Sequence, residues 1–340
     1  MSHRTIVIAD HHKSVFVCQI LDRKTGEARR STLQSRRDQL RPFLAGLPGP
    51  VLVFVEACRS WEWVSDLCTD LGLEFRLVNP RHMPEIAKSV KKTDRADVNA
   101  MVTRFLVDKL PESRVASRAE REFRALTREL TSLRFDHRVM LQKIHALVDA
   151  QGMPATKKQF ATDAWREQVR EELSGDTWFL LNRLLERWDA NREERERFEQ
   201  RIKALGQNLS NVALLQTIPG VGPVIAATIV AEVPNISEFK SARHFAAFTG
   251  LVPRVRSSAG KPRIGSITKA GPPALRWALT QSIFASQTSK DPTEPFLQYR
   301  RKRKKGKAPK VALCAAAHKL ARIVWAMLTH QTEYRTTATA

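Results

Sequence analysis

The first 110 residues alternate strand and helix signals, and this order constrains the fold more than any other feature of the chain. β-branched and apolar runs mark the strands, and amphipathic stretches mark the helices. The expected elements are, in chain order, strands at residues 4–10, 14–21 and 27–33, a helix at 34–47, a strand at 51–55, a helix at 61–71, a strand at 74–78 and a helix at 94–110. The order βββαβαβα predicts an α/β domain.

Four acidic side chains lie at the ends of expected strands or at the start of an expected helix. Asp10 ends the first strand, and Glu56 directly follows the fourth. Asp94 and Asp97 lie three residues apart at the start of the last helix, so they share one face. The order of elements resembles that of the RNase H superfamily, in whose sheet the first and fourth strands are neighbours. This resemblance implies that the four carboxylates converge.

Clustered carboxylates repel one another unless cations neutralise them, which indicates a divalent-metal site. We expect two Mg²⁺ ions, a number that suits phosphodiester cleavage. The structural alternative is that Asp94 caps its helix and Asp10 is a turn acid, but all four acids together favour the metal site. His11 and His12 are neighbours on an extended chain and should point to opposite faces. A surface or supporting role is favoured for them over joint ligation of a metal.

A long helical segment follows, in which apolar residues recur at spacings of three and four from Phe123 onward. The seam consists of Leu126, Leu130, Leu133, His137, Met140, Ile144 and Leu147. Such a seam predicts either a coiled coil or an amphipathic helix that packs within its own chain, and the sequence leaves both open. A second block, from Trp178 to Leu205, could return antiparallel to the first. We expect residues 113–210 to form an α-helical coiled-coil connector.

Charge is distributed unevenly along the chain, which carries a formal net charge of +22. Residues 211–340 hold 20 basic and 5 acidic side chains, whereas residues 1–112 hold 18 and 14. This asymmetry predicts a nucleic-acid-binding domain at residues 211–340 and a catalytic domain at residues 1–112. No uninterrupted apolar stretch is long enough to span a bilayer, and no signal peptide opens the chain. We therefore expect a soluble, cytoplasmic protein without a membrane partner.

Two segments of the basic third could contact nucleic acid. Gly220-Val221-Gly222 lies between two expected short helices and could present backbone N–H groups to a phosphate, as in a helix-hairpin-helix, or could form only a tight turn. The run from Arg300 to Lys310 holds eight basic residues in eleven, which suits phosphate binding or a solvated loop. The candidate nucleic-acid-binding residues are Gly220, Gly222, Lys269, Arg300, Arg301, Lys302, Arg303, Lys304 and Lys305.

Short motifs at both ends of the chain resemble one family, the DEDD transposases that include the Piv invertase and the bridge-RNA-guided insertion-sequence recombinases. The motifs are Glu56-Ala57, Asn79-Pro80, Lys92-Thr93-Asp94-Arg95-Ala96-Asp97, Ile218-Pro219-Gly220-Val221-Gly222, Phe245-Ala246-Ala247-Phe248, Gly250-Leu251-Val252-Pro253 and Ile267-Thr268-Lys269-Ala270-Gly271. The resemblance implies an RNase H-like (RuvC-like) N-terminal domain, a helical connector, and a mainly α C-terminal domain with a helix-hairpin-helix-like segment.

The resemblance also implies site residues and partners. The family's metal ligands correspond to Asp10, Glu56, Asp94 and Asp97. Its nucleophilic serine, five residues after the proline of the Gly-Leu-x-Pro motif, corresponds to Ser258. Because Ala259 follows where the family has glycine, Ser257 is the alternative. The family further implies an element-encoded structured guide RNA and a homo-oligomer, a dimer or tetramer, in which two subunits build a composite site.

We therefore expect a transposase that cuts and rejoins the DNA of an insertion sequence with a metal-bound DEDD site and a serine nucleophile. One alternative is a RuvC-like junction-cutting nuclease, which needs the four acids but no serine. The other is a non-catalytic nucleic-acid-binding protein that uses only the basic third. The nuclease predicts that substitution of the serines leaves cleavage intact. The binding protein predicts that substitution of Asp10 changes nothing measurable beyond affinity.

Overall fold

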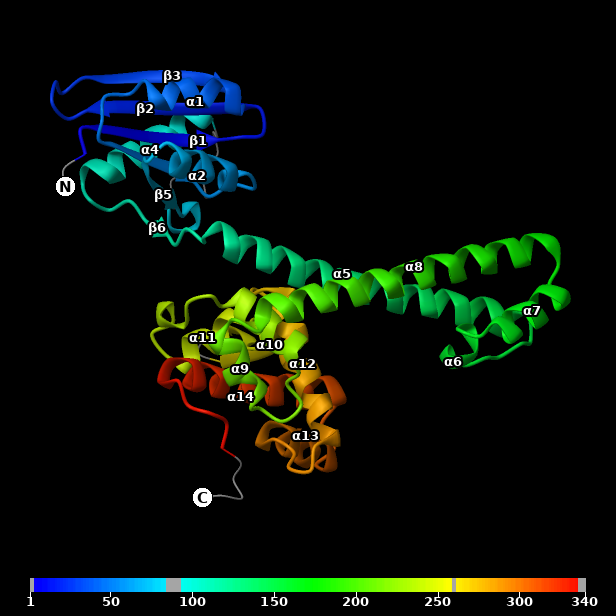
Figure 1. The fold of residues 1–340 in the computed structure, drawn as a ribbon. Coiled ribbons are helices and arrows are strands. Elements are labelled where there is room, and N and C mark those ends of the chain that lie inside the picture. The colour runs from blue at the N-terminus through cyan, green and yellow to red at the C-terminus, as the bar shows by residue number, and fades with distance from the viewer. Residues whose placement is uncertain (1–2, 84–92, 259–260, 336–340) are drawn as a thin grey trace. The chain divides into compact units, whose positions relative to one another are not determined.

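The computed structural model describes residues 3–83, 93–258 and 261–335 (Figure 1), and of residues 81, 255–258 and 261–264 it describes the backbone alone. The chain forms two compact units, residues 1–118 and 119–340. The first is an α/β domain, and the second is mainly helical. The finer division at residues 112 and 210 stays a prediction.

A mixed β-sheet forms the centre of the first unit. Its strands are β1 (Thr5–His11), β2 (Val15–Asp22), β3 (Ala28–Gln34), β4 (Val51–Glu56), β5 (Glu74–Val78) and β6 (Glu112–Ser113). They lie in the order β3-β2-β1-β4-β5-β6. β1 pairs antiparallel with β2 and parallel with β4, with Ala9 opposite Val55. The carboxyl ends of β1 and β4, which carry Asp10 and Glu56, therefore lie next to each other.

Helices cover both faces of this sheet. They are α1 (Arg37–Ala45), α2 (Trp61–Asp70) and α4 (Asp94–Leu106). Side chains alternate along a strand, so Val7 of β1 packs in the core beneath α1 and α2, whereas Ile8 packs in the core beneath α4. Burial on both faces explains why β4 is apolar throughout.

The predicted order of strands and helices in this unit is confirmed, with small shifts at the element ends. α1 begins at Arg37 rather than residue 34 because β3 continues to Gln34. α4 ends at Leu106 rather than Leu110, where the left-handed backbone of Asp108 (φ 56°) is incompatible with continued helix. The two-residue strand β6 is too short to give a sequence signal.

Two long helices dominate the first half of the second unit. α5 (Arg118–Ala150) and α8 (Gly175–Gly206) run antiparallel, and the short helices α6 (Lys157–Phe160) and α7 (Asp163–Glu172) lie between them in the chain (Figure 1). The His137 ring stacks on Trp188 with centroids 5.6 Å apart, and Asn191 Nδ2 donates to the Leu133 carbonyl at 3.1 Å. The apolar seam of α5 thus packs within its own chain, as one of the two interpretations predicted. Coiled-coil packing stays a prediction.

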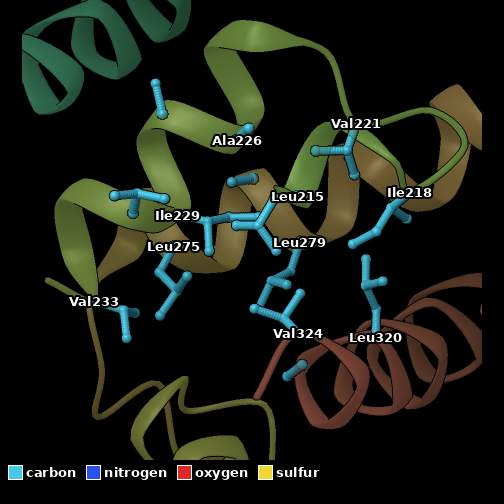
Figure 2. Close-up of a cluster of buried hydrophobic side chains, with 14 of the residues drawn as sticks. Leu215, Ile218, Val221, Ala226, Ile229, Val233, Leu275, Leu279, Leu320 and Val324 are labelled. Atoms are coloured by element: carbon cyan, nitrogen blue, oxygen red, sulfur yellow. The ribbon is translucent and has the colours of Figure 1, made fainter. Parts of the chain in front are cut away.

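The second half is a helical bundle with one β-hairpin. Its elements are α9 (Ser210–Gln216), α10 (Pro223–Glu232), α11 (Ala242–Phe248), β7 (Pro253–Ser258), β8 (Lys261–Ile267), α12 (Pro273–Ala285), α13 (Glu294–Lys304) and α14 (Pro309–His330). Leu215, Ile229, Leu279 and Val324 meet in its core (Figure 2). Helix α10 follows the Gly220-Val221-Gly222 turn as expected, whereas α9 ends at Gln216, before residues 218–233, where both short helices were expected. The helix-hairpin-helix arrangement stays a prediction, and the hairpin β7–β8 was not predicted.

Helix α14 corrects the expectation that no segment is long and apolar enough to cross a membrane. Its 22 residues meet that test by length and composition. In the structure, however, Leu320 and Val324 are buried against the other helices of the bundle (Figure 2). The apolar character of α14 is thus accounted for by its place in the core.

Candidate metal centre and nucleic-acid interface

Three of the four predicted acids meet at the end of the central strands. Ligand atoms of Asp10, Glu56 and Asp97 all lie within 4.8 Å of one another. Asp10 is the sixth residue of β1, Glu56 ends β4, and Asp97 is in the first turn of α4. Asp10 and Asp97 are buried, with 2% and 5% of their surfaces exposed. Parallel pairing of β1 with β4 and packing of α4 on the sheet therefore bring these carboxylates together.

A second cluster shares Asp10 and is more exposed. Ligand atoms of Asp10, His12 and Asp94 also lie within 4.8 Å of one another. His12 Nε2 is 3.0 Å from Asp10 Oδ2 and 3.2 Å from Asp94 Oδ1. All four predicted acids thus belong to one site, with Asp10 common to both clusters.

Asp94 does not cap its helix, which removes the structural alternative for this residue. The N-cap of α4 is Thr93, whose hydroxyl accepts a hydrogen bond from the Ala96 N–H at 3.3 Å. Asp94 follows as the first helical residue, with 47% of its side chain exposed. Its carboxylate is therefore available to the cluster around Asp10.

The electrostatics of the site favour a bound cation. Burial raises the pKa of Asp10, as does repulsion from Asp94 and Asp97, while His12 lowers it. A raised pKa means that the carboxylate is destabilised in its charged form, and a divalent ion would relieve this cost. Carboxylate oxygens are hard ligands, so the residues present fit a divalent metal.

His11 and His12 point to opposite sides, as the extended backbone predicted. His11 is buried, with Nε2 2.5 Å from Ser35 Oγ and Nδ1 3.4 Å from Cys58 Sγ. Burial lowers the pKa of His11 to about 4, so the ring is neutral near pH 7. Its ring also meets the edge of Trp63 at 5.4 Å. His11 therefore supports the segment after β4 and contributes nothing to the acidic cluster.

The two candidate serines lie on the β-hairpin formed by β7 and β8. Ser257 is paired with Pro262 and Ser258 with Lys261 near the end of the β7–β8 ladder. Ala259, Gly260 and, in the N-terminal motif, Lys92 lie outside the described residues. The backbone thus places both serines at the end of the hairpin opposite its base.

The base of this hairpin is built from two of the sequence motifs. Gly250 has φ 70°, and an added Cβ there would lie 2.8 Å from the Ala270 nitrogen. A Cβ on Gly271 would lie 1.7 Å from the Phe248 oxygen, so neither position can accept a side chain without movement. Lys269 N–H donates to the Gly250 carbonyl at 3.1 Å. The Gly-Leu-x-Pro and Thr-Lys-Ala-Gly motifs therefore pack against each other at the base of the hairpin.

The glycines of the Gly220-Val221-Gly222 turn have different surroundings. Gly220 adopts φ 88°, and an added Cβ would lie 2.3 Å from the Ser286 nitrogen at the end of α12. Gly222 is the exposed N-cap of α10, with open space where its Cβ would be. A tight turn explains Gly220, and phosphate binding by the turn stays a prediction.

The basic run lies mainly on a helix instead of a disordered loop. Arg300 to Lys304 form the last turns of α13, and Lys305 caps it. Of the six candidate residues in this run, Lys302 is half-buried and the other five are exposed. Lys269, at the base of the hairpin, is exposed as well. Sequence reasoning missed Phe284, which is 42% exposed and meets the ring of Tyr299 edge-on at 5.8 Å. A lone aromatic within an apolar helix gives no signal of such exposure.

Comparisons with known proteins agree on one family. A family model described as "Transposase" (DEDD_Tnp_IS110) matches residues 9–152, and one described as "Transposase IS116/IS110/IS902 family" matches residues 212–300.

Relatives that cover most of the chain carry the same description. A probable family 20 transposase of Pseudomonas aeruginosa is 29% identical over 96% of this chain and 97% of its own. A putative transposase (y4pF/y4sB) of Sinorhizobium fredii is 30% identical over 88% of this chain and 78% of its own. The transposase for insertion sequence element IS1328 of Yersinia enterocolitica is 28% identical over 88% and 89%. This chain therefore belongs to the IS110/IS116/IS902 family of insertion-sequence transposases, enzymes that cut and rejoin DNA.

Proposed function

We propose that residues 1–112 form an RNase H-like (RuvC-like) catalytic domain whose acids bind two Mg²⁺ ions and direct cleavage of the element's DNA. The observation that carries this proposal is the shared position of Asp10, whose carboxylate belongs to two overlapping ligand clusters. Glu56 and Asp97 complete the inner cluster, and Asp94 completes the outer one. The match of residues 9–152 to a DEDD transposase model supports the same assignment.

The acidic residues of such a site differ in their burial and therefore in their roles. When bound, divalent ions supply charge neutralisation at the scissile phosphate and activate the attacking oxygen. Asp10 and Asp97 are held rigidly by burial, whereas Asp94 lies half exposed on the side open to solvent. A DNA phosphate would therefore approach from the side of Asp94.

We further propose that Ser258, or Ser257 in its place, is the nucleophile of strand exchange. The serine oxygen would form a bond to phosphorus while the bond to one strand end breaks; the hydroxyl proton leaves, and the departing oxygen takes up a proton. Support comes from the motif spacing and from the hairpin, whose base is fixed by Gly250 and Gly271. The acids of one subunit would meet the serine of another in a dimer or tetramer.

We also propose that the basic C-terminal third binds DNA together with a structured guide RNA from the element. The exposed residues on α13 support this, because dense positive charge binds phosphates with little dependence on sequence. The candidates are Gly220, Gly222, Lys269, Arg300, Arg301, Lys302, Arg303, Lys304 and Lys305. Tyr299, on the same helix, and Phe284 of α12, whose ring contacts it, offer aromatic surface.

A covalent protein–DNA adduct is the test of the proposal. The protein is incubated with Mg²⁺, element-end DNA and RNA transcribed from the element's flanks, and the products are separated on a denaturing gel. We expect a slowly migrating adduct with the wild type and none with Ser258→Ala or Asp94→Asn. Loss of the adduct with Ser257→Ala alone would move the nucleophile by one residue.

Cleavage without an adduct would favour the nuclease alternative, because a water-dependent cut leaves no bond between protein and DNA. Cleavage that survives Asp10→Asn would contradict the metal site itself. DNA binding should survive in all four variants, since each substitution changes one small side chain. A gel-shift measurement on each variant checks this.

A further inference from the structure

We infer that His12 is a nitrogen ligand of the outer metal position, so that this position accepts a first-row transition ion such as Mn²⁺ in preference to Mg²⁺. The inference rests on the proposed metal site; it adds a fifth ligand and replaces Mg²⁺ by a transition ion as the preferred ion of the outer position. The sequence had favoured a surface or supporting role for this residue.

The separations between the three side chains match those of ligands on one ion. Two ligands that bind one ion at about 2.1 Å and at right angles are about 3 Å apart. His12 Nε2 lies 3.0 Å from Asp10 Oδ2, at hydrogen-bond distance, and 3.2 Å from Asp94 Oδ1. An ion would take the place of the proton between these atoms and could bind all three after small movements of the side chains.

The backbone explains why His12 and not His11 reaches this place. Asp10 and His12 are two residues apart on an extended segment, so their side chains lie on the same side. His12 follows the last residue of β1, and its N–H donates to the Val15 carbonyl at 2.8 Å in the turn to β2. His11, on the opposite side, is held by Ser35 and Cys58.

The two clusters differ in donor chemistry and in exposure. Asp10, Glu56 and Asp97 offer oxygen alone, whereas the outer cluster adds an imidazole nitrogen. Mg²⁺ takes oxygen ligands, whereas transition ions also accept imidazole. The side chains of His12 and Asp94 are 51% and 47% exposed, which leaves room for water or a phosphate oxygen on the same ion.

Electron spin-echo spectroscopy of Mn²⁺ bound to the full-length, metal-stripped protein tests this inference directly. We expect modulation from an imidazole nitrogen in the wild type and its loss in His12→Ala and His12→Gln. His244→Ala, which removes an exposed imidazole from α11, is the matched control and should retain the modulation. Nitrogen modulation that is absent in the wild type, or that persists in both His12 variants, would overturn the inference.

Binding titrations provide the second readout. His12→Ala should weaken Mn²⁺ binding about tenfold and leave Mg²⁺ binding within about twofold. Equal losses for both ions would overturn the preference for Mn²⁺. Thermal unfolding checks that the variant is folded, which we expect because His12 is half exposed.

Failure of the inference is distinguishable from failure of the metal site. Mn²⁺ that binds without nitrogen modulation, and that is lost in Asp97→Asn and Asp94→Asn, would leave the four-acid site in place and remove His12 alone. A wild type that binds no Mn²⁺ and no Mg²⁺ would overturn both.

Discussion

Arg128 binds the carboxylate of Glu232 through two parallel hydrogen bonds, from Nε to Oε1 at 2.7 Å and from Nη2 to Oε2 at 2.8 Å. Only 1% of the Glu232 side chain is exposed. Next to this pair, Arg124 Nε donates to the Ala231 carbonyl at 2.9 Å. Long helix α5 is therefore fixed to the end of α10 by two arginines one turn apart.

Removal of Arg128 should destabilise the second unit. Arg128→Ala leaves a buried carboxylate without its two-bond partner, so we expect the free energy of unfolding to fall by about 2–3 kcal/mol. Arg170→Ala is the control, because its pair with Glu167 is exposed at 3.5 Å and should contribute less than about 0.5 kcal/mol. Guanidinium titrations of both variants measure the difference, and equal effects would contradict the assignment.

The two glycines of the turn before α10 should respond differently to alanine. Gly220→Ala forces a left-handed residue with a Cβ against Ser286, and we expect a loss of about 2–4 kcal/mol. Gly222→Ala meets no atom within 4 Å and should cost less than about 1 kcal/mol, mainly as a poorer N-cap. Thermal unfolding of the pair checks this. A large DNA-binding defect in the stable Gly222→Ala variant would support contact of the turn with phosphate.

Asp97→Asn should abolish cleavage and remove the stabilisation that a bound metal gives to the protein. The substitution takes one charged oxygen from the cluster with Asp10 and Glu56. Mg²⁺ should raise the melting temperature of the wild type but not that of the variant. Calorimetry with and without EDTA measures the effect, and an equal rise in both proteins would contradict the role of Asp97 as a ligand.

His137 should make the packing of α5 on α8 sensitive to acid. Burial is the main cause that lowers the pKa of His137 from 6.5 to about 4, and the positive charges of Arg195 and Lys157 contribute to the same shift. Because the folded-state pKa lies below the unfolded one, the stability that His137 contributes is present above pH 6.5 and is lost as the pH falls towards 4. Between pH 7 and 5 we expect a loss of about 1 kcal/mol.

The His137→Phe variant keeps an aromatic ring on Trp188 and should lose this part of the pH dependence. The exposed His244→Ala variant should retain it. Unfolding of each protein is followed at both pH values. Parallel curves for the wild type and His137→Phe would rule out His137 as the origin.

Sequence periodicity predicted the first unit well because the strands β1 and β4 are apolar and buried on both faces. The expectation that Asp10, Glu56, Asp94 and Asp97 converge came from the resemblance to the RNase H superfamily, in whose sheet the first and fourth strands are neighbours. Sequence reasoning missed His12 because a histidine two residues after an acid has no distinctive spacing. Asp94 meets Asp10 and His12 only because α4, which carries Asp94, packs on the sheet.

The second unit was harder to predict because its structure depends on close contacts between distant residues. The sequence placed α5, α8 and the turn at Gly220, each of which has a local signal. The hairpin β7–β8 has basic and serine residues where an alternating strand would have apolar ones. Its base depends on the approach of Gly250 to Ala270, and no pattern along the chain reveals that contact.

Asp10 also determines how easily a copy of this element can lose its activity. Its carboxylate is common to both ligand clusters, so one substitution to asparagine would weaken both metal positions at once. The aspartate and asparagine codons differ by a single base. Asparagine fills almost the same volume and carries no charge, so the encoded protein would still fold and bind DNA. One point mutation could therefore leave an element whose own protein binds its DNA without moving it.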